Sequence, residues 1–152
     1  MIKMVNVLVV DDDPKMREML SEILTNQGYH VTVCENGEEA IDTSFNELFN
    51  IALIDITLPD MEGTELLSKL RKSEPPLIKI IITGNATLNN SIEAANKGVD
   101  AYIVKPFNPA KLVDLLKEKL EEQKRKVEFN DEKLGEYIAH RYEWMNKASI
   151  KK

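Results

Sequence analysis

The sequence predicts an α/β protein built on a doubly wound parallel sheet. Short apolar runs rich in β-branched residues alternate five times with segments whose apolar residues recur at helical spacing. Most of the strand candidates are apolar on both faces, which is typical of a parallel sheet covered by helices on both sides. The chain has 152 residues, 43% of them hydrophobic, a length that suits one domain with a substantial core plus an appendage.

The first unit has well-marked boundaries. Residues 5–10 are apolar except for Asn6 and lead directly into a cluster of aspartates, so a strand is predicted there. Asp13 can cap the helix that follows, and Pro14 suits the first helical position because it has no N–H to satisfy. Gly28 can end this helix.

The remaining units repeat this order. Their strands are predicted at 30–34, 49–54, 77–83 and 101–104. The helices after these strands are predicted at 37–45, 63–72 and 88–97 and from 109 onward. Asn36 and Asn108 can cap the first and last of these helices, and Gly98 can end the third.

Polar residues stand where four of the predicted strands end. Asp11 and Asp12 follow the first strand, Asp55 follows the third, Thr83 ends the fourth and Lys105 follows the fifth. In an open parallel sheet the carboxyl ends of the strands lie along one edge, where ligands bind. We therefore expect three carboxylates, a hydroxyl and an ammonium group to meet in one cleft.

This set of groups indicates phosphoryl chemistry that depends on a divalent ion. Crowded carboxylates repel one another unless a cation compensates them, and oxygen-only ligands suit Mg²⁺. A carboxylate can attack phosphorus, while a lysine and a hydroxyl neutralise and hold the phosphoryl oxygens. Each residue has a simpler explanation, since Asp55 could be a turn residue and Lys105 an exposed charge. Their joint occurrence at four strand ends favours a site.

Four segments resemble the receiver domain of bacterial and archaeal response regulators, the phosphoacceptors of two-component signalling. They are Val7 to Pro14, Asp55 to Gly63, Thr83-Gly84 and Tyr102 to Phe107, in the order and spacing of that family. The resemblance covers residues 4 to about 122. It implies a five-stranded flavodoxin-like sheet of order 2-1-3-4-5.

The resemblance also implies roles for the carboxylates. Asp55 would accept a phosphoryl group from a histidine kinase or a phosphotransfer protein. Asp12 would bind Mg²⁺ directly and Asp11 chiefly through water, with the Asp55 carboxylate and the carbonyl of Thr57 as further ligands and Mn²⁺ as an alternative ion. Such a protein is a signalling phosphoacceptor that assists only its own phosphorylation and dephosphorylation, not an enzyme acting on other substrates.

A switch is implied by the same resemblance. Lys105 would pair with the phosphoryl group, Thr83 would close onto it, and Tyr102 would turn inward. The resulting change would alter the face formed by the fourth helix, fifth strand and fifth helix, and with it the choice of protein partner. Lys105 precedes Pro106, where a cis peptide is accessible, and Thr57 and Asn85 are placed to influence water attack on the phosphoryl group.

Two other functions compete with this interpretation. Asp11-x-Asp13, a later Thr and a following Lys loosely resemble the haloacid dehalogenase phosphatases, but Pro14 and Lys15 depart from that pattern and no acidic pair follows Lys105. That alternative also leaves Asp55 unexplained. The second competitor is a phosphate-independent adaptor, which usually lacks one residue of the cluster, whereas all are present here.

The C-terminal part differs in charge from the rest. Within a formal net charge of −6, residues 1–122 hold 12 basic and 21 acidic side chains, whereas residues 123–152 hold 8 and 5. We expect a receiver domain over 1–122 and a basic helical extension over 123–152. The fifth helix is predicted to run to about Lys126, and a further helix to begin at Asn130, with Phe129 packed against Leu134.

The extension is expected to be a docking or dimerisation element, the alternative being a helix that folds back on its own domain or frays. It presents Leu134, Ile138, Tyr142 and Met145 in a one-sided pattern, with aromatic residues that serve well as interface anchors. We do not expect DNA binding, because thirty residues are too few for a helix-turn-helix unit with its own core. The downstream protein target is not indicated by the sequence.

The location expected from the sequence is the cytoplasm. The apolar runs are much shorter than a membrane span, and the N-terminal residues lead into a strand instead of a signal peptide. Cys34 is the single cysteine and so has no internal disulfide partner, which fits a reducing compartment.

Overall fold

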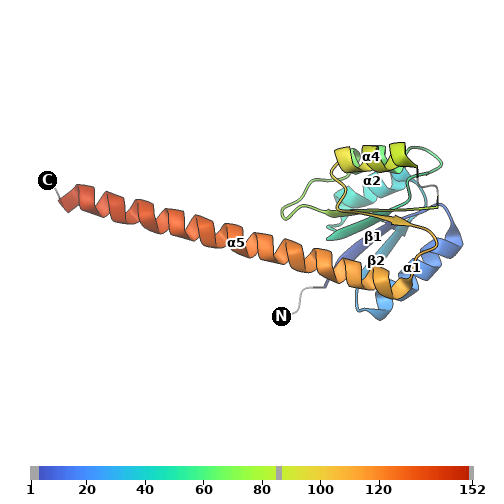
Figure 1. The fold of residues 1–152 in the computed structure, drawn as a ribbon, viewed down its shortest axis with the longest axis horizontal. Coiled ribbons are helices and arrows are strands. Elements are labelled where there is room, and N and C mark those ends of the chain that lie inside the picture. The colour runs from blue at the N-terminus through green and yellow to red at the C-terminus, as the bar shows by residue number, and fades with distance from the viewer. Residues whose placement is uncertain (1–3, 85–86, 151–152) are drawn as a thin grey trace. The chain divides into compact units, whose positions relative to one another are not determined.

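The structure is a computed structural model that describes residues 4–84 and 87–150, apart from the side chains of residues 88 and 146–150. Its strands are β1 (Asn6–Val10), β2 (His30–Cys34), β3 (Ile51–Ile54), β4 (Ile78–Thr83) and β5 (Ala101–Val104). Its helices are α1 (Pro14–Asn26), α2 (Gly37–Asn46), α3 (Gly63–Lys69), α4 (Leu88–Asn96) and α5 (Pro109–Ile150). These alternate along the chain as the sequence predicts (Figure 1).

The five strands form one sheet of order β2-β1-β3-β4-β5, and every neighbouring pair is parallel. The predicted fold class and strand order are therefore confirmed. Val10 at the end of β1 pairs with Ile54 at the end of β3, so the residues that follow these two strands emerge side by side. Thr83 and Val104 are likewise paired at the ends of β4 and β5.

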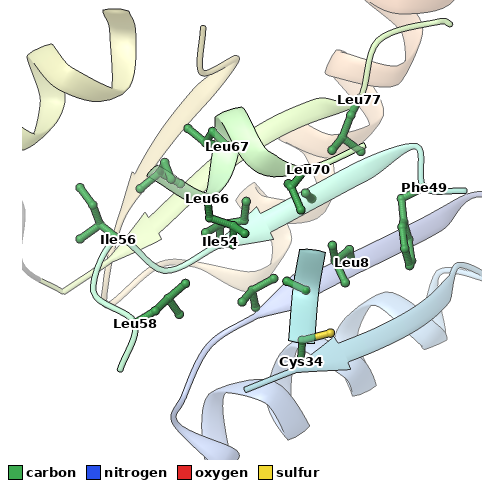
Figure 2. Close-up of a cluster of buried hydrophobic side chains, with 14 of the residues drawn as sticks. Leu8, Cys34, Phe49, Ile54, Ile56, Leu58, Leu66, Leu67, Leu70 and Leu77 are labelled. Atoms are coloured by element: carbon green, nitrogen blue, oxygen red, sulfur yellow. The ribbon is translucent and has the colours of Figure 1, made fainter. Parts of the chain in front are cut away.

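Helices cover both faces of the sheet, with α2 and α4 over one face and α1 over the other (Figure 1). Alternate strand residues point to opposite faces. One face contributes Leu8 and Ile54 to a cluster that also includes Ala40 of α2 and Leu66 of α3 (Figure 2). The buried strand residues outside this cluster include Val7, Val9, Leu53, Ile80 and Ile82. The sheet is thus apolar on both sides, as in other parallel sheets.

Capping side chains define several helix ends. Asp13 accepts a hydrogen bond from the N–H of Lys15 and Asn36 accepts one from Glu39, as predicted. Asn108 accepts one from the N–H of Ala110 at 2.9 Å, at the start of α5. These caps fix the first turns of the helices that follow β1, β2 and β5, close to the carboxyl edge of the sheet.

The third helix ends three residues earlier than predicted, at Lys69 instead of Lys72. Leu70 has an extended backbone (φ −69°, ψ 151°), and its side chain is buried in the core. The next amide, of Arg71, donates to Oγ of Ser44 at 3.1 Å instead of continuing the helix. Tertiary packing of Leu70 thus overrides the local helical pattern.

The chain divides into two compact units, residues 1–117 and 118–152. Helix α5 extends to Ile150 without the predicted new start at Asn130, so that prediction is wrong. No Gly or Pro lies between residues 123 and 134 to end the helix first, and Phe129 and Leu134 are both 57% exposed instead of packed against each other.

Among the residues that the structure describes, no helix has both the length and the apolar character that a membrane span requires.

Candidate functional site

Three carboxylates gather at the carboxyl ends of β1 and β3. One carboxylate oxygen from each of Asp11, Asp12 and Asp55 lies within 4.8 Å of the others. Asp11 is buried, Asp12 is exposed and Asp55 is intermediate, so the cluster opens to solvent on one side. This is an all-oxygen donor set of the kind that hard divalent cations prefer. The predicted acidic cluster is therefore present.

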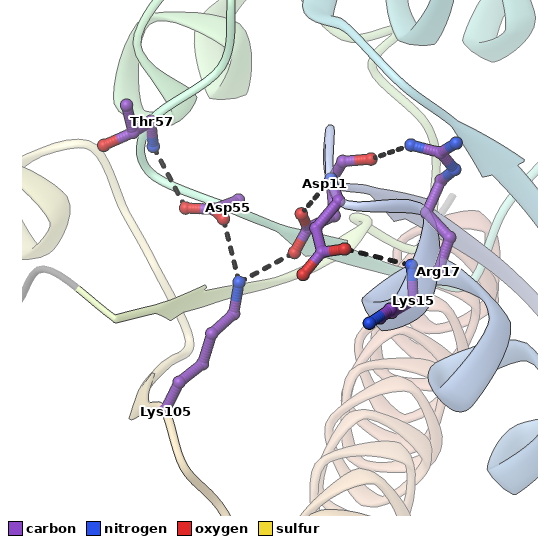
Figure 3. Close-up of polar contacts among 7 residues, drawn as sticks. Asp11, Lys15, Arg17, Asp55, Thr57 and Lys105 are labelled. Atoms are coloured by element: carbon purple, nitrogen blue, oxygen red, sulfur yellow. Dashed lines mark hydrogen bonds and ion pairs between the residues drawn. The ribbon is translucent and has the colours of Figure 1, made fainter.

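Lys105 bridges two of these carboxylates (Figure 3). Its Nζ lies 2.8 Å from Oδ2 of Asp11 and 2.9 Å from Oδ2 of Asp55. The side chain is 18% exposed and comes from the residue directly after β5. The peptide bond to Pro106 is cis, as expected for this position. Lys105 thus contacts Asp55 and Asp11, which lie 50 and 94 positions before it in the sequence.

Burial and pairing shift the pKa values of this network in opposite senses. Burial raises the pKa of Asp11, although hydrogen bonds from Lys105 and from the N–H of Asp13 partly counter this effect. Burial alone would lower the pKa of Lys105, but its hydrogen bonds to Asp11 and Asp55 outweigh burial and raise it. The ammonium form of Lys105 is thereby favoured, which supplies the positive charge that the carboxylates require.

The loop between β3 and α3 also contacts the Asp55 carboxylate, through a backbone amide. The N–H of Thr57 donates to Oδ1 of Asp55 at 3.1 Å (Figure 3), and Thr57 forms an isolated antiparallel bridge with Glu62. Gly63 closes the loop, since its N–H donates to the carbonyl of Ile56 at 2.6 Å. A Cβ at Gly63 would overlap the carbonyl oxygen of Asp55, so this position requires glycine for close backbone approach.

Thr83 and Tyr102 lie on neighbouring strands beside this network. Thr83 is 1% exposed, and its carbonyl accepts a hydrogen bond from the N–H of Lys105 at 2.8 Å. Tyr102 packs against the core cluster, and its hydroxyl is buried without a hydrogen-bond partner among the residues that the structure describes. Asn85, singled out in the sequence, lies outside the described residues.

The sequence model of the response regulator receiver domain matches residues 7–117 of the chain. The chain belongs to this family. The match ends at Lys117, which is also the last residue of the first compact unit. The family assignment also separates the chain from the haloacid dehalogenase phosphatases considered above.

Individual receiver proteins resemble this chain closely. A CheY-like response regulator receiver domain protein from Methanospirillum hungatei JF-1 has 46% identity and a TM-score of 0.78, covering 82% of this chain and 99% of that one. A response regulator from Burkholderia pseudomallei, solved with a phosphorylated aspartic acid, a calcium ion and citrate, has 26% identity and a TM-score of 0.65, covering 72% and 64%.

Longer regulators share the same receiver domain. The probable transcriptional regulatory protein TcrX of Mycobacterium tuberculosis is 35% identical over 109 residues, which are 72% of this chain and 47% of that protein. The transcriptional regulatory protein SrrA of Staphylococcus aureus is 33% identical over 108 residues, which are 70% and 44%. The chain thus spans about half the length of the curated relatives it matches.

Two residues around the receiver site were not identified from the sequence. Nη1 of Arg17 donates to the carbonyl of Asp11 at 2.7 Å, and Nη2 lies 3.8 Å from Oε2 of Glu35. Asp60, in the β3–α3 loop, accepts hydrogen bonds from two amides at the start of α2. Arg17 falls on the amphipathic helix α1 and Asp60 in a loop, so neither carries a local signal for its contact.

Proposed function

We propose that this receiver domain accepts a phosphoryl group on Asp55 from a histidine kinase or phosphotransfer protein and relays the signal by changing protein partners. The observation that carries the proposal is the contact of the Asp55 carboxylate with Lys105 at 2.9 Å inside the acidic cluster. The Asp55 side chain is 11% exposed, so part of it is accessible to a donor while the protein fixes its position.

The transfer itself needs alignment and charge neutralisation more than covalent assistance. An oxygen of Asp55 attacks phosphorus as the bond from phosphorus to the imidazole nitrogen of the donor breaks, and that nitrogen keeps the bonding electron pair and takes a proton from solvent. Lys105 neutralises the added negative charge at the point where it develops. The N–H of Thr57, already hydrogen-bonded to Asp55 at 3.1 Å, restricts the orientation of the attacking carboxylate.

The carboxylates of Asp11, Asp12 and Asp55, with the carbonyl of Thr57, would hold Mg²⁺, and Mn²⁺ is the alternative ion. The cluster fits a hard divalent cation because its donors are oxygens only and lie within 4.8 Å of one another. When bound, the ion neutralises carboxylate and phosphoryl charge that Lys105 alone cannot balance. The calcium ion and phosphorylated aspartate named for the Burkholderia pseudomallei regulator agree with this proposal.

Phosphorylation is proposed to act through Thr83 and Tyr102. The phosphoryl group carries about two negative charges, roughly one more than the carboxylate that it modifies, and it adds three acceptor oxygens toward which the Thr83 hydroxyl can move. Thr83 and Lys105 are joined through the backbone hydrogen bond at 2.8 Å, so motion at one strand end is passed to the other. Tyr102 has a buried hydroxyl to re-orient, and the surface of α4, β5 and the start of α5 changes as a result.

We propose that residues 1–122 form the receiver domain and that the extension, residues 123–152, serves in docking or dimerisation. Seven of its large apolar side chains are more than half exposed: Phe129, Leu134, Tyr137, Ile138, Tyr142, Trp144 and Met145. Aromatic and methionine side chains are enriched at protein interfaces. Residues 118–150 form part of one helix, whereas a helix-turn-helix unit needs two, so we do not assign DNA binding to them.

The proposed partners are a histidine kinase upstream and a protein target downstream. The proposed location of the reaction is the cytoplasm. Cys34 is buried and, as the single cysteine, forms no disulfide within the chain, which fits a reducing compartment. Burial raises its pKa, so the protein does not present it as a reactive thiolate.

The proposal is tested by incubating the full chain with a small phosphodonor, such as acetyl phosphate, and Mg²⁺, and measuring intact mass. The wild-type protein should gain one phosphoryl group and Asp55→Ala none. Asp13→Ala is the matched control, because Asp13 belongs to the same acidic run but caps α1 and should leave phosphorylation intact. Phosphorylation of Asp55→Ala would contradict the assignment of the acceptor.

A second comparison tests the extension and the adaptor alternative. Oligomeric state and kinase pairing are measured for the full chain and for residues 1–122, each with and without phosphodonor. A docking or dimerisation role predicts that the two proteins differ, and identical behaviour would contradict it. A phosphate-independent adaptor predicts that partner binding does not change with phosphorylation.

A further inference from the structure

Asp60 links the loop after β3 to the start of α2. Its Oδ1 accepts a hydrogen bond from the N–H of Gly37 at 2.9 Å, and its Oδ2 accepts one from Glu38 at 2.8 Å. Asn36 satisfies the next amide, of Glu39, at 2.8 Å. The first turn of α2 is therefore capped by two side chains, one from its own segment and one from a residue more than twenty positions away.

The loop that carries Asp60 is closed at its base. Thr57 bridges Glu62, and the N–H of Leu58 donates to the carbonyl of Met61 at 3.3 Å. Met61 also lies against the start of α2, since a Cβ at Gly37 would be 2.5 Å from its Sδ. The loop of residues 57–62 is thus a short closed unit with one end at the acidic cluster and its tip fixed on α2.

We propose that Asp60 is a positioning residue that sets the Mg²⁺ affinity of the acidic cluster by fixing the loop that carries the Thr57 carbonyl. This inference rests on the proposed function, in which that carbonyl is a metal ligand. A carbonyl on an exposed loop binds a metal well only if the loop keeps its place, because ordering it on binding costs free energy. Groups that orient metal ligands without touching the metal typically change metal affinity by about 10- to 100-fold.

The turn of residues 35–38 supports both sides of the site. It receives Asp60 on the β3 side, and on the β1 side Glu35 faces Arg17, whose Nη1 is bonded to the Asp11 carbonyl at 2.7 Å. This turn contributes no proposed metal ligand. Its contacts nevertheless reach the two segments that supply the ligands, which is the arrangement expected of a supporting shell.

Asp60→Ala and Asn36→Ala form a matched pair for the test. Each removes a cap from the same helix start, and so each should lower thermal stability, but only Asp60→Ala removes hydrogen bonds between the loop and α2. Mg²⁺ binding to the full chain is measured by titration calorimetry, with the metal alone and no phosphodonor. We expect the dissociation constant to rise about tenfold for Asp60→Ala and less than about twofold for Asn36→Ala.

Asp60→Asn keeps one acceptor oxygen and is expected to fall between wild type and Asp60→Ala; it also serves if the alanine variant does not fold. At saturating Mg²⁺, phosphorylation of Asp60→Ala should return to the wild-type rate, since affinity and not chemistry is affected. Equal Mg²⁺ affinity in Asp60→Ala and wild type, or an equal loss in Asn36→Ala, would overturn the inference.

The same measurements separate this inference from the proposed function. If the wild-type protein binds Mg²⁺ and is phosphorylated at Asp55 while Asp60→Ala binds equally well, only the positioning role of Asp60 is wrong. If the wild-type protein neither binds Mg²⁺ nor accepts a phosphoryl group, the proposed function is wrong and the inference is lost with it.

Discussion

Lys105 lies with its Nζ 2.9 Å from Oδ2 of Asp55, and the same ammonium is 2.8 Å from Asp11. The two carboxylates follow neighbouring strands whose last residues are paired, so the fold forces them together. The ammonium places a positive charge between the two carboxylates. The site therefore contains an ion network with Lys105 at its centre.

Removing this ammonium should destabilise the metal-free protein more than removing an exposed one. Lys105→Ala leaves two partly buried carboxylates without their cation, and we expect the free energy of unfolding to fall by about 2 kcal/mol. Lys69→Ala is the control, because Lys69 is paired with Glu65 at the same distance of 2.9 Å but is 47% exposed. Lys69→Ala should lower the free energy of unfolding by less than about 0.5 kcal/mol.

Urea unfolding with a chelator and then with Mg²⁺ checks this prediction. Added Mg²⁺ should stabilise Lys105→Ala more than wild type, because the ion no longer competes with the ammonium for the carboxylates. Equal stability of Lys105→Ala and Lys69→Ala would contradict the proposed central role of the Lys105 ammonium.

The close approach at Gly63 makes a second prediction. Gly63→Ala places a Cβ against the Asp55 carbonyl oxygen and within 2.8 Å of the Cα of Ile56, so the backbone must move. We expect a loss of about 1 to 3 kcal/mol in urea unfolding, together with weaker Mg²⁺ binding. Gly135→Ala is the control, since nothing lies within 4 Å of a Cβ there and alanine should favour the helix by about 1 kcal/mol. Unchanged stability in Gly63→Ala would show that the loop tolerates a side chain.

The position of the candidate site could be predicted from the sequence because the positions of strand ends follow from the topology of the sheet. Once parallel strands are assigned, Asp11, Asp55 and Lys105 must share an edge, whatever their separation in the chain. The contact of Asp60 with α2 was not predictable in this way, because it depends on how a loop tip approaches a helix. The early end of α3 was likewise set by the burial of Leu70, a tertiary effect that helical periodicity does not record.

Tyr102 allows a third prediction. Its hydroxyl is buried and has no hydrogen-bond partner among the described residues, and a buried polar group of this kind is unfavourable. Tyr102→Phe should therefore be as stable as wild type or more stable by up to about 1 kcal/mol. If Tyr102 is part of the switch, the variant should still be phosphorylated but show a changed response in partner binding. A clear loss of stability would mean that the hydroxyl has a partner in the folded protein.

The Asp60 carboxylate predicts a dependence of stability on pH. Hydrogen bonds from Gly37 and Glu38 lower its pKa below the ordinary value of about 3.9. The folded state therefore binds this proton more weakly than the unfolded state, so its contribution to stability is present above the unfolded pKa and is lost as the pH falls through the folded pKa. Asp60→Asn lacks this titration. Its deficit relative to wild type should be full near neutral pH and shrink in acid.

Urea unfolding from about pH 6 to about pH 3 measures this deficit across the range where the carboxylate titrates. Asn36→Ala is the control, because it removes a cap of the same helix that has no titrating group, so its deficit should not follow the titration of Asp60. A deficit for Asp60→Asn that stays constant into acid would contradict the prediction. It would mean that the carboxylate charge does not contribute to fixing the loop on α2, and that hydrogen-bond geometry alone does so.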